Sequence, residues 1–184
     1  MEVEVIRSRR KTLSAQIREG RVVVRAPLRT TDAEIRQFLE KHRRWLEKHL
    51  AKAREMEESK ANLRRLTPED IRALKKQARK VIPERAAYYA PLIGVTYGGI
   101  SIRCQKTRWG SCSAKGDLSF NCLLMLTPPG VVDSIVVHEL CHRKVMNHSA
   151  RFYTEVLKVL PDYRQHQKWL REHGEMILAM ADKA

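Results

Sequence analysis

The chain has 184 residues, enough for one domain or for a compact core with an appended arm, and 43% of them are hydrophobic. Its formal net charge is +15, and the excess lies mainly in residues 1–100, where 24 Lys and Arg face 13 Asp and Glu. Such a charge attracts nucleic acids, nucleotides or other polyanions, and a solvated basic surface without such a partner explains it equally well. The start, MEVEVIRSRR, lacks the pattern of a secretory signal, and no apolar run approaches the roughly 18 residues of a membrane-spanning helix, so we expect a cytoplasmic protein with reduced cysteines.

The first 66 residues predict a basic arm. Between residues 2 and 26, β-branched and alternating apolar residues predict two strands, which the turn at Glu19-Gly20 joins as a hairpin. Thr31 and Glu34 have the spacing of a capping box, which predicts the start of a helix. Residues 51–66 carry alternating charges and few large apolar groups, as expected for a helix end and a linker. We therefore divide the chain into an arm, residues 1–66, and a second domain, residues 67–184.

The second domain is expected to begin with a helix. The run Thr67-Pro68-Glu69-Asp70 combines a cap, a proline in the first turn and acids near the positive end of the helix dipole. Pro83 should kink or interrupt this helix. Glycines 94, 98 and 99 bracket one short predicted strand, and Ile100 and Ile102 indicate another. Residues 107–121 predict a strand, a turn at residues 115–117 and a return strand.

Three more helices complete the prediction. Residues 131–145 are strongly apolar at their start, which predicts a buried helix that ends near Asn147. Ser149 should cap the next helix, which stops at Pro161. Asp162 can cap the last one.

The segment His138-Glu139-Leu140-Cys141-His142 is an HExxH motif on the predicted buried helix. Residues four apart share one face of a helix, so both histidines can point an imidazole at one metal ion. The residue after the first histidine lies about 100° around the helix, where a carboxylate can reach water bound to that metal. Zinc accepts such nitrogen ligands and leaves a position open for water, whose pKa it lowers to about 7. The motif predicts a zinc site with Glu139 as the general base.

A third protein ligand is needed beside His138 and His142. His148 follows His142 by six residues, the spacing of the HExxHxxGxxH pattern of metzincins, although Val145 stands where that pattern has glycine. We favour His148, because a short turn after the helix would return it to the same metal. Acidic residues further along the chain are the competing third ligands: Glu155, Glu172 and Glu175.

Two further features leave their roles open. Trp109, Gly110, Ser111 and Cys112 place small residues around one large ring, which indicates a close backbone approach, and core packing is a simpler explanation than a substrate-facing wall. The group that would stabilise an oxyanion is not assigned. Proximity in the sequence suggests three residues: Arg108, Arg151 and Tyr153.

Three stretches together resemble the YgjP-like metal-dependent hydrolase family: IRSRRKTLSAQIREGRVVVRAP, RWGSCSAKGDLSFN and VVHELCHRKVMNHSARFY. The resemblance runs from about residue 3 to Trp169. It implies that His138, His142 and His148 bind zinc and that Glu139 is catalytic. It also implies a relationship to zincin metallopeptidases and to SprT-like proteases, which cut proteins cross-linked to DNA. The family has further been described as a metal-dependent pyrophosphatase acting on UTP.

We therefore predict an α+β, zincin-like fold: a small antiparallel sheet packed on helices, a central HExxH helix, and an N-terminal β-hairpin and helix. The predicted function is a zinc metallopeptidase acting on a peptide or protein. One alternative is a metal-dependent nucleoside triphosphate (UTP) pyrophosphatase. The other is a DNA-associated protease or nucleic-acid-binding module with a vestigial zinc site. Nickel, cobalt or iron could replace zinc at three histidines, and the sequence does not set the oligomeric state.

Overall fold

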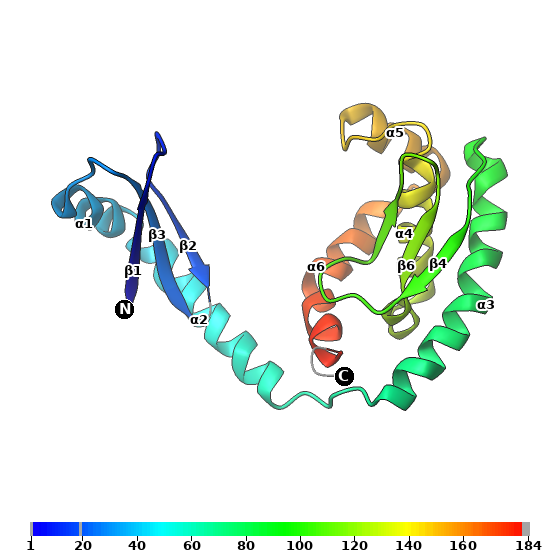
Figure 1. Cartoon of the computed structure of the whole chain (residues 1–184), viewed down its shortest axis with the longest axis horizontal. Coiled ribbons are helices and arrows are strands. Elements are labelled where there is room, and N and C mark those ends of the chain that lie inside the picture. The colour runs from blue at the N-terminus through cyan, green and yellow to red at the C-terminus, as the bar shows by residue number, and fades with distance from the viewer. Residues whose placement is uncertain (1, 19, 182–184) are drawn as a thin grey trace. The chain divides into compact units, whose positions relative to one another are not determined.

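The computed structural model describes residues 2–18 and 20–181, and the chain divides into two compact units, residues 1–62 and 63–184. Each unit combines helices with a three-stranded sheet, which confirms the predicted α+β class (Figure 1). None of the helices among the described residues is long and apolar enough to cross a membrane.

The sheet of the first unit has three strands rather than the predicted hairpin of two. They are β1 (Val3–Ser8), β2 (Ser14–Arg18) and β3 (Arg21–Pro27), in the order β1-β3-β2. The hairpin is formed by β2 and β3, which are antiparallel, while β1 is parallel to β3. The prediction was wrong in merging the first two strands, because a basic loop of five residues separates their apolar segments. Gly20, with a positive φ of 71°, supplies the backbone angle that the turn requires.

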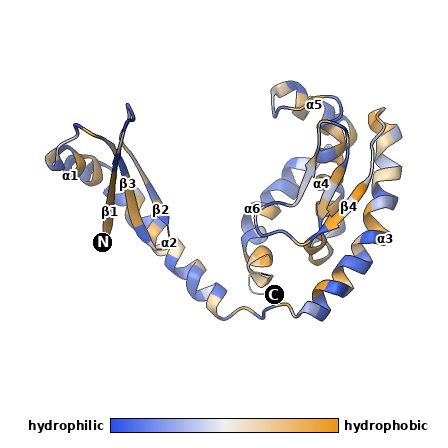
Figure 2. Ribbon diagram, viewed as in Figure 1, coloured by the Kyte–Doolittle hydropathy of each residue, from blue (hydrophilic) through white to orange (hydrophobic). Residues whose placement is uncertain are grey.

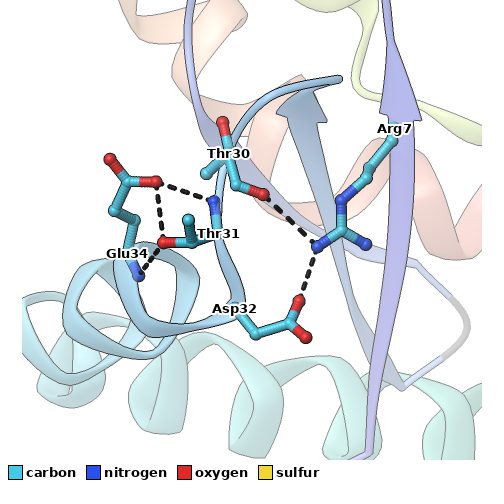
Figure 3. A network of polar contacts seen from close by, with 5 residues as sticks. All are labelled: Arg7, Thr30, Thr31, Asp32 and Glu34. Atoms are coloured by element: carbon cyan, nitrogen blue, oxygen red, sulfur yellow. Dashed lines mark hydrogen bonds and ion pairs between the residues drawn. The ribbon is translucent and has the colours of Figure 1, made fainter.

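Two helices cover one face of this sheet. They are α1 (Asp32–Lys41) and α2 (Arg43–Ala61), and α1 begins at the predicted capping box. The backbone N–H of Thr31 donates to Glu34 Oε2 at 2.7 Å, and the N–H of Glu34 donates to Thr31 Oγ1 at 3.3 Å. Figure 3 shows that Arg7, from β1, joins this network by donating to Asp32 Oδ1 at 2.5 Å. The small buried core between the sheet and these helices consists of Val22, Val24, Ala26, Ile35, Leu46 and Leu50.

The second unit begins with the long helix α3 (Pro68–Ile93). The Thr67–Asp70 capping box starts it as predicted, and Gly94 ends it in the left-handed conformation at φ 75°. Pro83, which was expected to kink or interrupt the helix, lies inside it, so the predicted interruption was wrong. Apolar contacts explain why the helix continues, since the residues just before and after Pro83 are buried: Ala78, Ile82, Ala86, Tyr89 and Ala90.

The sheet of the second unit has one parallel and one antiparallel pair, whereas the prediction was wholly antiparallel. Its strands are β4 (Ile100–Arg103), β5 (Gly110–Cys112) and β6 (Leu118–Asn121), in the order β4-β6-β5. The β5–β6 hairpin is the predicted one, while β4 runs parallel to β6. No strand forms at residues 95–97, where one was predicted. A 3-10 helix, η1 (Cys122–Leu126), leads out of the sheet.

Three helices complete this unit: α4 (Pro129–Cys141), α5 (Ala150–Val159) and α6 (Tyr163–Met180). Helix α4 carries the HExxH motif and contacts α3, α5, α6 and β5, so it is central as predicted (Figure 1). Most of its residues are buried, and Figure 2 shows hydrophobic residues along α4 and β4. The Arg85 side chain of α3 donates two hydrogen bonds to the Asp133 carboxylate of α4, at 2.6 and 2.7 Å.

Residues 63–66, which were predicted to belong to the arm, lie in the second unit. Leu66 packs in its core, and its backbone N–H donates to Met180 O at 2.9 Å. Arg65 also hydrogen-bonds to the carbonyl oxygen of Ala179. These contacts attach the end of the linker to the end of α6.

Candidate metal centre

The structure brings together His138, His142 and His148. The Nε2 atom of His138 lies 3.2 Å from Nε2 of His142 and 3.0 Å from Nε2 of His148. Two nitrogens bound to one tetrahedral zinc at 2.0–2.1 Å would be about 3.3 Å apart. In the part of the chain that the structure describes, these three residues form the one group of His, Cys, Asp or Glu side chains able to hold a metal ion.

Helix α4 ends earlier than predicted, and this ending places the third histidine. The helix stops at Cys141, with His142 as its C-cap, rather than near Asn147. The chain then turns, as the N–H groups of Lys144 and Val145 donate to Cys141 O at 3.0 Å each. The segment after this turn carries His148 back to the other two imidazoles, although Val145 replaces the metzincin glycine.

The second nitrogen of His142 fixes its tautomer. Its Nδ1 lies 3.1 Å from the carbonyl oxygen of Val145, which can only accept a hydrogen bond. Nδ1 therefore carries the proton, and the lone pair of Nε2 faces the other imidazoles. A cation among these nitrogens would remove the repulsion between lone pairs that point at one another.

Tyr163, at the start of α6, contacts the second nitrogen of His138. Its hydroxyl lies 2.7 Å from His138 Nδ1, so Nε2 can point into the cluster. Burial raises the pKa of the Tyr163 hydroxyl above its usual value. Burial, together with the two neighbouring histidines, lowers the pKa of His138 to about 3. In the metal-free protein His138 is thus a neutral imidazole, the form that binds metals.

Phe152, from α5, is a common neighbour of all three imidazoles. Its ring centroid lies 4.9 Å from that of His138, 4.6 Å from that of His142 and 5.0 Å from that of His148. The Phe152 side chain is fully buried. Because one rigid ring touches each imidazole, it limits the rotation of all three.

Glu139 lies beside strand β5. Its side chain is only 5% exposed, and this burial raises its pKa to about 8. A Cβ atom added to Gly110 would come within 2.6 Å of Glu139 Oε1, so the carboxylate lies directly against the strand backbone. The expected close approach at Trp109-Gly110 is therefore present, and it serves the motif as well as core packing. The Trp109 ring packs beside Gly174 of α6.

The competing third ligands have other contacts. Glu155 forms ion pairs with Lys144 at 2.9 Å and with Lys158 at 2.6 Å, which lower its pKa to about 2. Glu172 lies 3.9 Å from Lys168. Neither Glu172 nor Glu175, the third competitor, joins the three-histidine group.

The three residues suggested for oxyanion stabilisation differ in their surroundings. The Tyr153 ring is 6.5 Å from that of His148, and 40% of the residue is exposed. The Arg151 side chain is exposed on α5. Arg108 is held through its backbone carbonyl by Asn121, while its side chain is exposed. Tyr153 is therefore the member of this set that the ring geometry places beside an imidazole of the cluster.

Three residues of the site were not predicted from the sequence: Tyr163, Phe152 and Asn121. Asn121 is fully buried, and its Nδ2 donates to Gln105 O at 2.7 Å and to Arg108 O at 3.0 Å. It thereby shapes the loop that leads into β5. A polar residue between the apolar Phe120 and Cys122 was the available signal for Asn121. Nothing in the sequence pairs Tyr163 with His138, because they lie 25 residues apart.

Comparison with known proteins identifies the family. A model described as the YgjP-like metallopeptidase domain matches residues 11–72 and 57–173. The chain belongs to the YgjP-like family. The resemblance seen in the sequence is thus confirmed, and the family is a metallopeptidase family. The structure of this YgjP-like chain contains a three-histidine cluster suited to a metal ion.

Two solved structures are also similar to this YgjP-like chain. One is the metallopeptidase zymogen abylysin of Pyrococcus abyssi, with 21% identity and a TM-score of 0.46 over 50% of this chain and 94% of that one. The other is the metallopeptidase zymogen jannalysin of Methanocaldococcus jannaschii, with 19% identity and a TM-score of 0.45 over 50% and 96%. The comparison with curated proteins found no match.

Proposed function

We propose that the protein is a zinc-dependent peptidase in which His138, His142 and His148 hold the metal and Glu139 is the general base. One observation carries the proposal: three Nε2 atoms face one another, with that of His138 at 3.0–3.2 Å from the other two. Zinc bound by three imidazoles supplies Lewis-acid chemistry and lowers the pKa of water to about 7. Three neutral nitrogen ligands suit zinc better than magnesium or calcium, which prefer oxygen.

Glu139 is placed to move the proton of the attacking water. It directly follows His138 on α4, and its carboxylate is confined between the helix and the backbone of β5. The carboxylate would accept the proton from water and return it to the leaving amine nitrogen. Its burial shields this proton transfer from bulk solvent.

Strand β5 supports a peptide as the substrate. It is an edge strand of its sheet, since the order is β4-β6-β5, and its Gly110 lies against Glu139. An edge strand presents backbone N–H and C=O groups that an extended peptide can pair with. A peptide bound in this way would pass directly beside the general base.

The proposal is tested with Glu139→Gln and His148→Ala in the full-length, zinc-loaded chain. Glu139→Gln should keep about one zinc per chain and lose peptidase activity by at least about 100-fold, since general-base catalysis contributes about 10²–10⁴. His148→Ala should lose zinc. Glu155→Gln is the matched control, because this carboxylate is ion-paired with lysines outside the cluster. Full activity in Glu139→Gln, or full zinc content in His148→Ala, would refute the assignment.

UTP pyrophosphate hydrolysis is measured on the same preparations. Magnesium-dependent phosphate chemistry calls for clustered carboxylates, and the described residues offer only the three-histidine group as a metal site. We expect no release of pyrophosphate that depends on Glu139. Zinc-dependent UTP turnover that is lost in Glu139→Gln would instead favour the pyrophosphatase.

Nucleic acid is the second candidate, as a partner of the first unit. The loop between β1 and β2 carries Arg9, Arg10 and Lys11, next to Arg7 at the end of β1. Such a group of cations favours phosphate contacts. If the protein is recruited to DNA or RNA, binding should weaken steeply with salt and should be reduced by a triple substitution of these three residues to Gln. Nucleic-acid binding that changes neither with salt nor with the triple substitution would exclude this role for the loop between β1 and β2.

A further inference from the structure

Two cysteines lie side by side at the end of the second sheet. Strands β4 and β6 are parallel, and their last paired residues are Arg103 and Asn121. Cys104 and Cys122 are the next residues after each strand, and both are free thiols. The parallel register brings the two chain segments side by side, and the side chains of Cys104 and Cys122 are within hydrogen-bonding distance of each other.

The two thiols differ in access and interact with each other. Cys122 is fully buried, whereas Cys104 is half-buried. Burial raises the pKa of the Cys122 thiol to about 12, and a hydrogen bond with the Cys104 side chain adds to this effect. Because Cys122 is buried and Cys104 is half-buried, Cys104 is the sulfur that a reagent meets first.

Cys104 lines a depression with basic walls. The depression has a volume of about 330 Å³ and is bordered by Arg72, Lys75 and Lys106. Lysine and arginine side chains around a thiol attract anionic reagents to it. A negatively charged disulfide would be attracted to these walls and could present its sulfur atoms to Cys104.

We propose that Cys104 and Cys122 form a redox-active pair that a low-molecular-weight anionic disulfide converts to an intramolecular disulfide. Cys104 loses its proton to solvent, attacks one sulfur of the reagent and forms a mixed disulfide, and the other half of the reagent leaves as a thiolate. Cys122 then loses its proton to solvent and attacks the sulfur of Cys104. The reagent leaves as a second thiolate, so the protein loses two electrons and the reagent gains them.

The pair lies at the base of the loop that positions β5. Asn121, the residue before Cys122, holds the carbonyl oxygens of Gln105 and Arg108, which follow Cys104. The loop leads to Gly110, against which Glu139 lies. A bond of about 2.05 Å between the two sulfur atoms ties the ends of β4 and β6 to each other, and we expect it to shift the loop that these hydrogen bonds hold. This expectation rests on the proposed function: oxidation of the two cysteines should lower peptidase activity and leave the three histidines bound to zinc.

The disulfide is tested by treating the full-length protein with glutathione disulfide and mapping thiols by peptide mass spectrometry. We expect a Cys104–Cys122 linkage with Cys112 and Cys141 still reduced. Cys122→Ser should stop at the mixed disulfide on Cys104, and Cys104→Ser should resist the reagent. If all four thiols stay free, or if the linkage involves Cys112 or Cys141, the proposal is refuted.

The basic walls are tested by comparing glutathione disulfide with the neutral 2-hydroxyethyl disulfide. Lys75→Gln should slow the reaction with the anionic reagent by about 3- to 10-fold and barely affect the neutral one. Equal slowing of both reagents would exclude electrostatic guidance.

The activity effect is read separately. Oxidised protein should show several-fold lower peptidase activity that a reducing agent restores, with zinc content constant. Unchanged activity would overturn the regulatory consequence. If neither form has activity while the disulfide still forms, the proposed function fails and the redox pair stands.

Discussion

The two units share one strand topology but differ in chemistry. In each, the third strand lies between the first and the second, parallel to the first and antiparallel to the second. The central strands lead to different helices. Strand β3 leads to α1, in which Ile35 is the one buried residue, whereas β6 leads through η1 to the buried helix α4. The same arrangement of strands is therefore followed by a mostly exposed helix, α1, in one unit and by a buried candidate catalytic helix, α4, in the other.

Burial is the physical basis of this difference. A helix with one buried residue positions its side chains loosely, because solvent allows many rotamers. Helix α4 is enclosed on several sides, so His138 and Glu139 are restrained by neighbours from α5, α6 and β5. Substitutions at these neighbours should disturb the site, and substitutions in the first unit should not.

The largest effect is expected for Gly110→Ala. The added methyl group would lie 2.6 Å from Glu139 Oε1 and 2.8 Å from its Cγ, which forces the carboxylate to move. We expect peptidase kcat/KM to fall by about 100-fold or more, while zinc content stays near one per chain. Gly99→Ala is the control, because its methyl group would meet Asp117 Oδ1 at an ordinary 3.7 Å. Equal activity in the two variants would show that β5 does not confine Glu139.

The next effect concerns the stability of the metal-free protein. The pKa of Glu139 rises from 4.5 to about 8 on folding, because burial favours the protonated carboxyl group. The contribution of this protonated group to the free energy of unfolding is complete below pH 4.5 and is lost as the pH rises to 8. Glu139→Gln cannot ionise and avoids this loss. At pH 9 without metal it should exceed the wild type in unfolding free energy by about 3 to 5 kcal/mol, with little difference at pH 4.

Denaturant unfolding at the two pH values measures this effect. Glu155→Gln is the matched control, because lysines hold the pKa of Glu155 low instead of raising it. It should bring no gain in stability at pH 9. A constant difference between Glu139→Gln and the wild type across pH would contradict the burial argument.

Tyr163→Phe should weaken metal binding without abolishing it. The change removes the hydroxyl 2.7 Å from His138 Nδ1 and keeps the buried ring. Loss of such a supporting hydrogen bond costs about 10- to 100-fold in metal affinity. Competition with a chromogenic chelator measures the change, and Tyr153→Phe, on the exposed side of the cluster, should bind as the wild type does. Unchanged affinity in Tyr163→Phe would remove Tyr163 from the site.

The smallest effect is expected for Thr31→Ala in the first unit. Loss of the side-chain cap on Glu34 N–H should cost about 1 kcal/mol and speed amide exchange in residues 32–41. Thr67→Ala removes the corresponding cap of α3 and should act on that helix instead. Exchange in α4 should not respond to Thr31→Ala. A response there would contradict the purely local role of the cap.

Local patterns in the sequence predicted the parts of the fold that depend on neighbours in the chain. Both capping boxes form, because each uses groups only three residues apart. The β5–β6 hairpin and the gathering of the HExxH histidines also depend on short spacings. The proposed metal site was therefore predictable from the sequence, although metal binding itself stays a prediction.

Features that depend on distant segments were not predictable. The parallel pairings of β1 with β3 and of β4 with β6 join strands separated by other strands. Pro83 stays inside α3 because tertiary packing offsets the local cost of the proline. The contacts of Tyr163 with His138, and of Gly110 with Glu139, also link residues more than 20 positions apart.

The link between Leu66 and Met180 has a practical consequence for dissecting the molecule. The amide of Leu66 and the guanidinium of Arg65 both donate to carbonyl oxygens at the end of α6, so the first residues of the second unit are bound to its last helix. A recombinant fragment cut at Thr67 would leave those carbonyls without partners and open a gap beside α3. A fragment that begins at or before residue 63 would retain these hydrogen bonds and is the better choice for crystallisation.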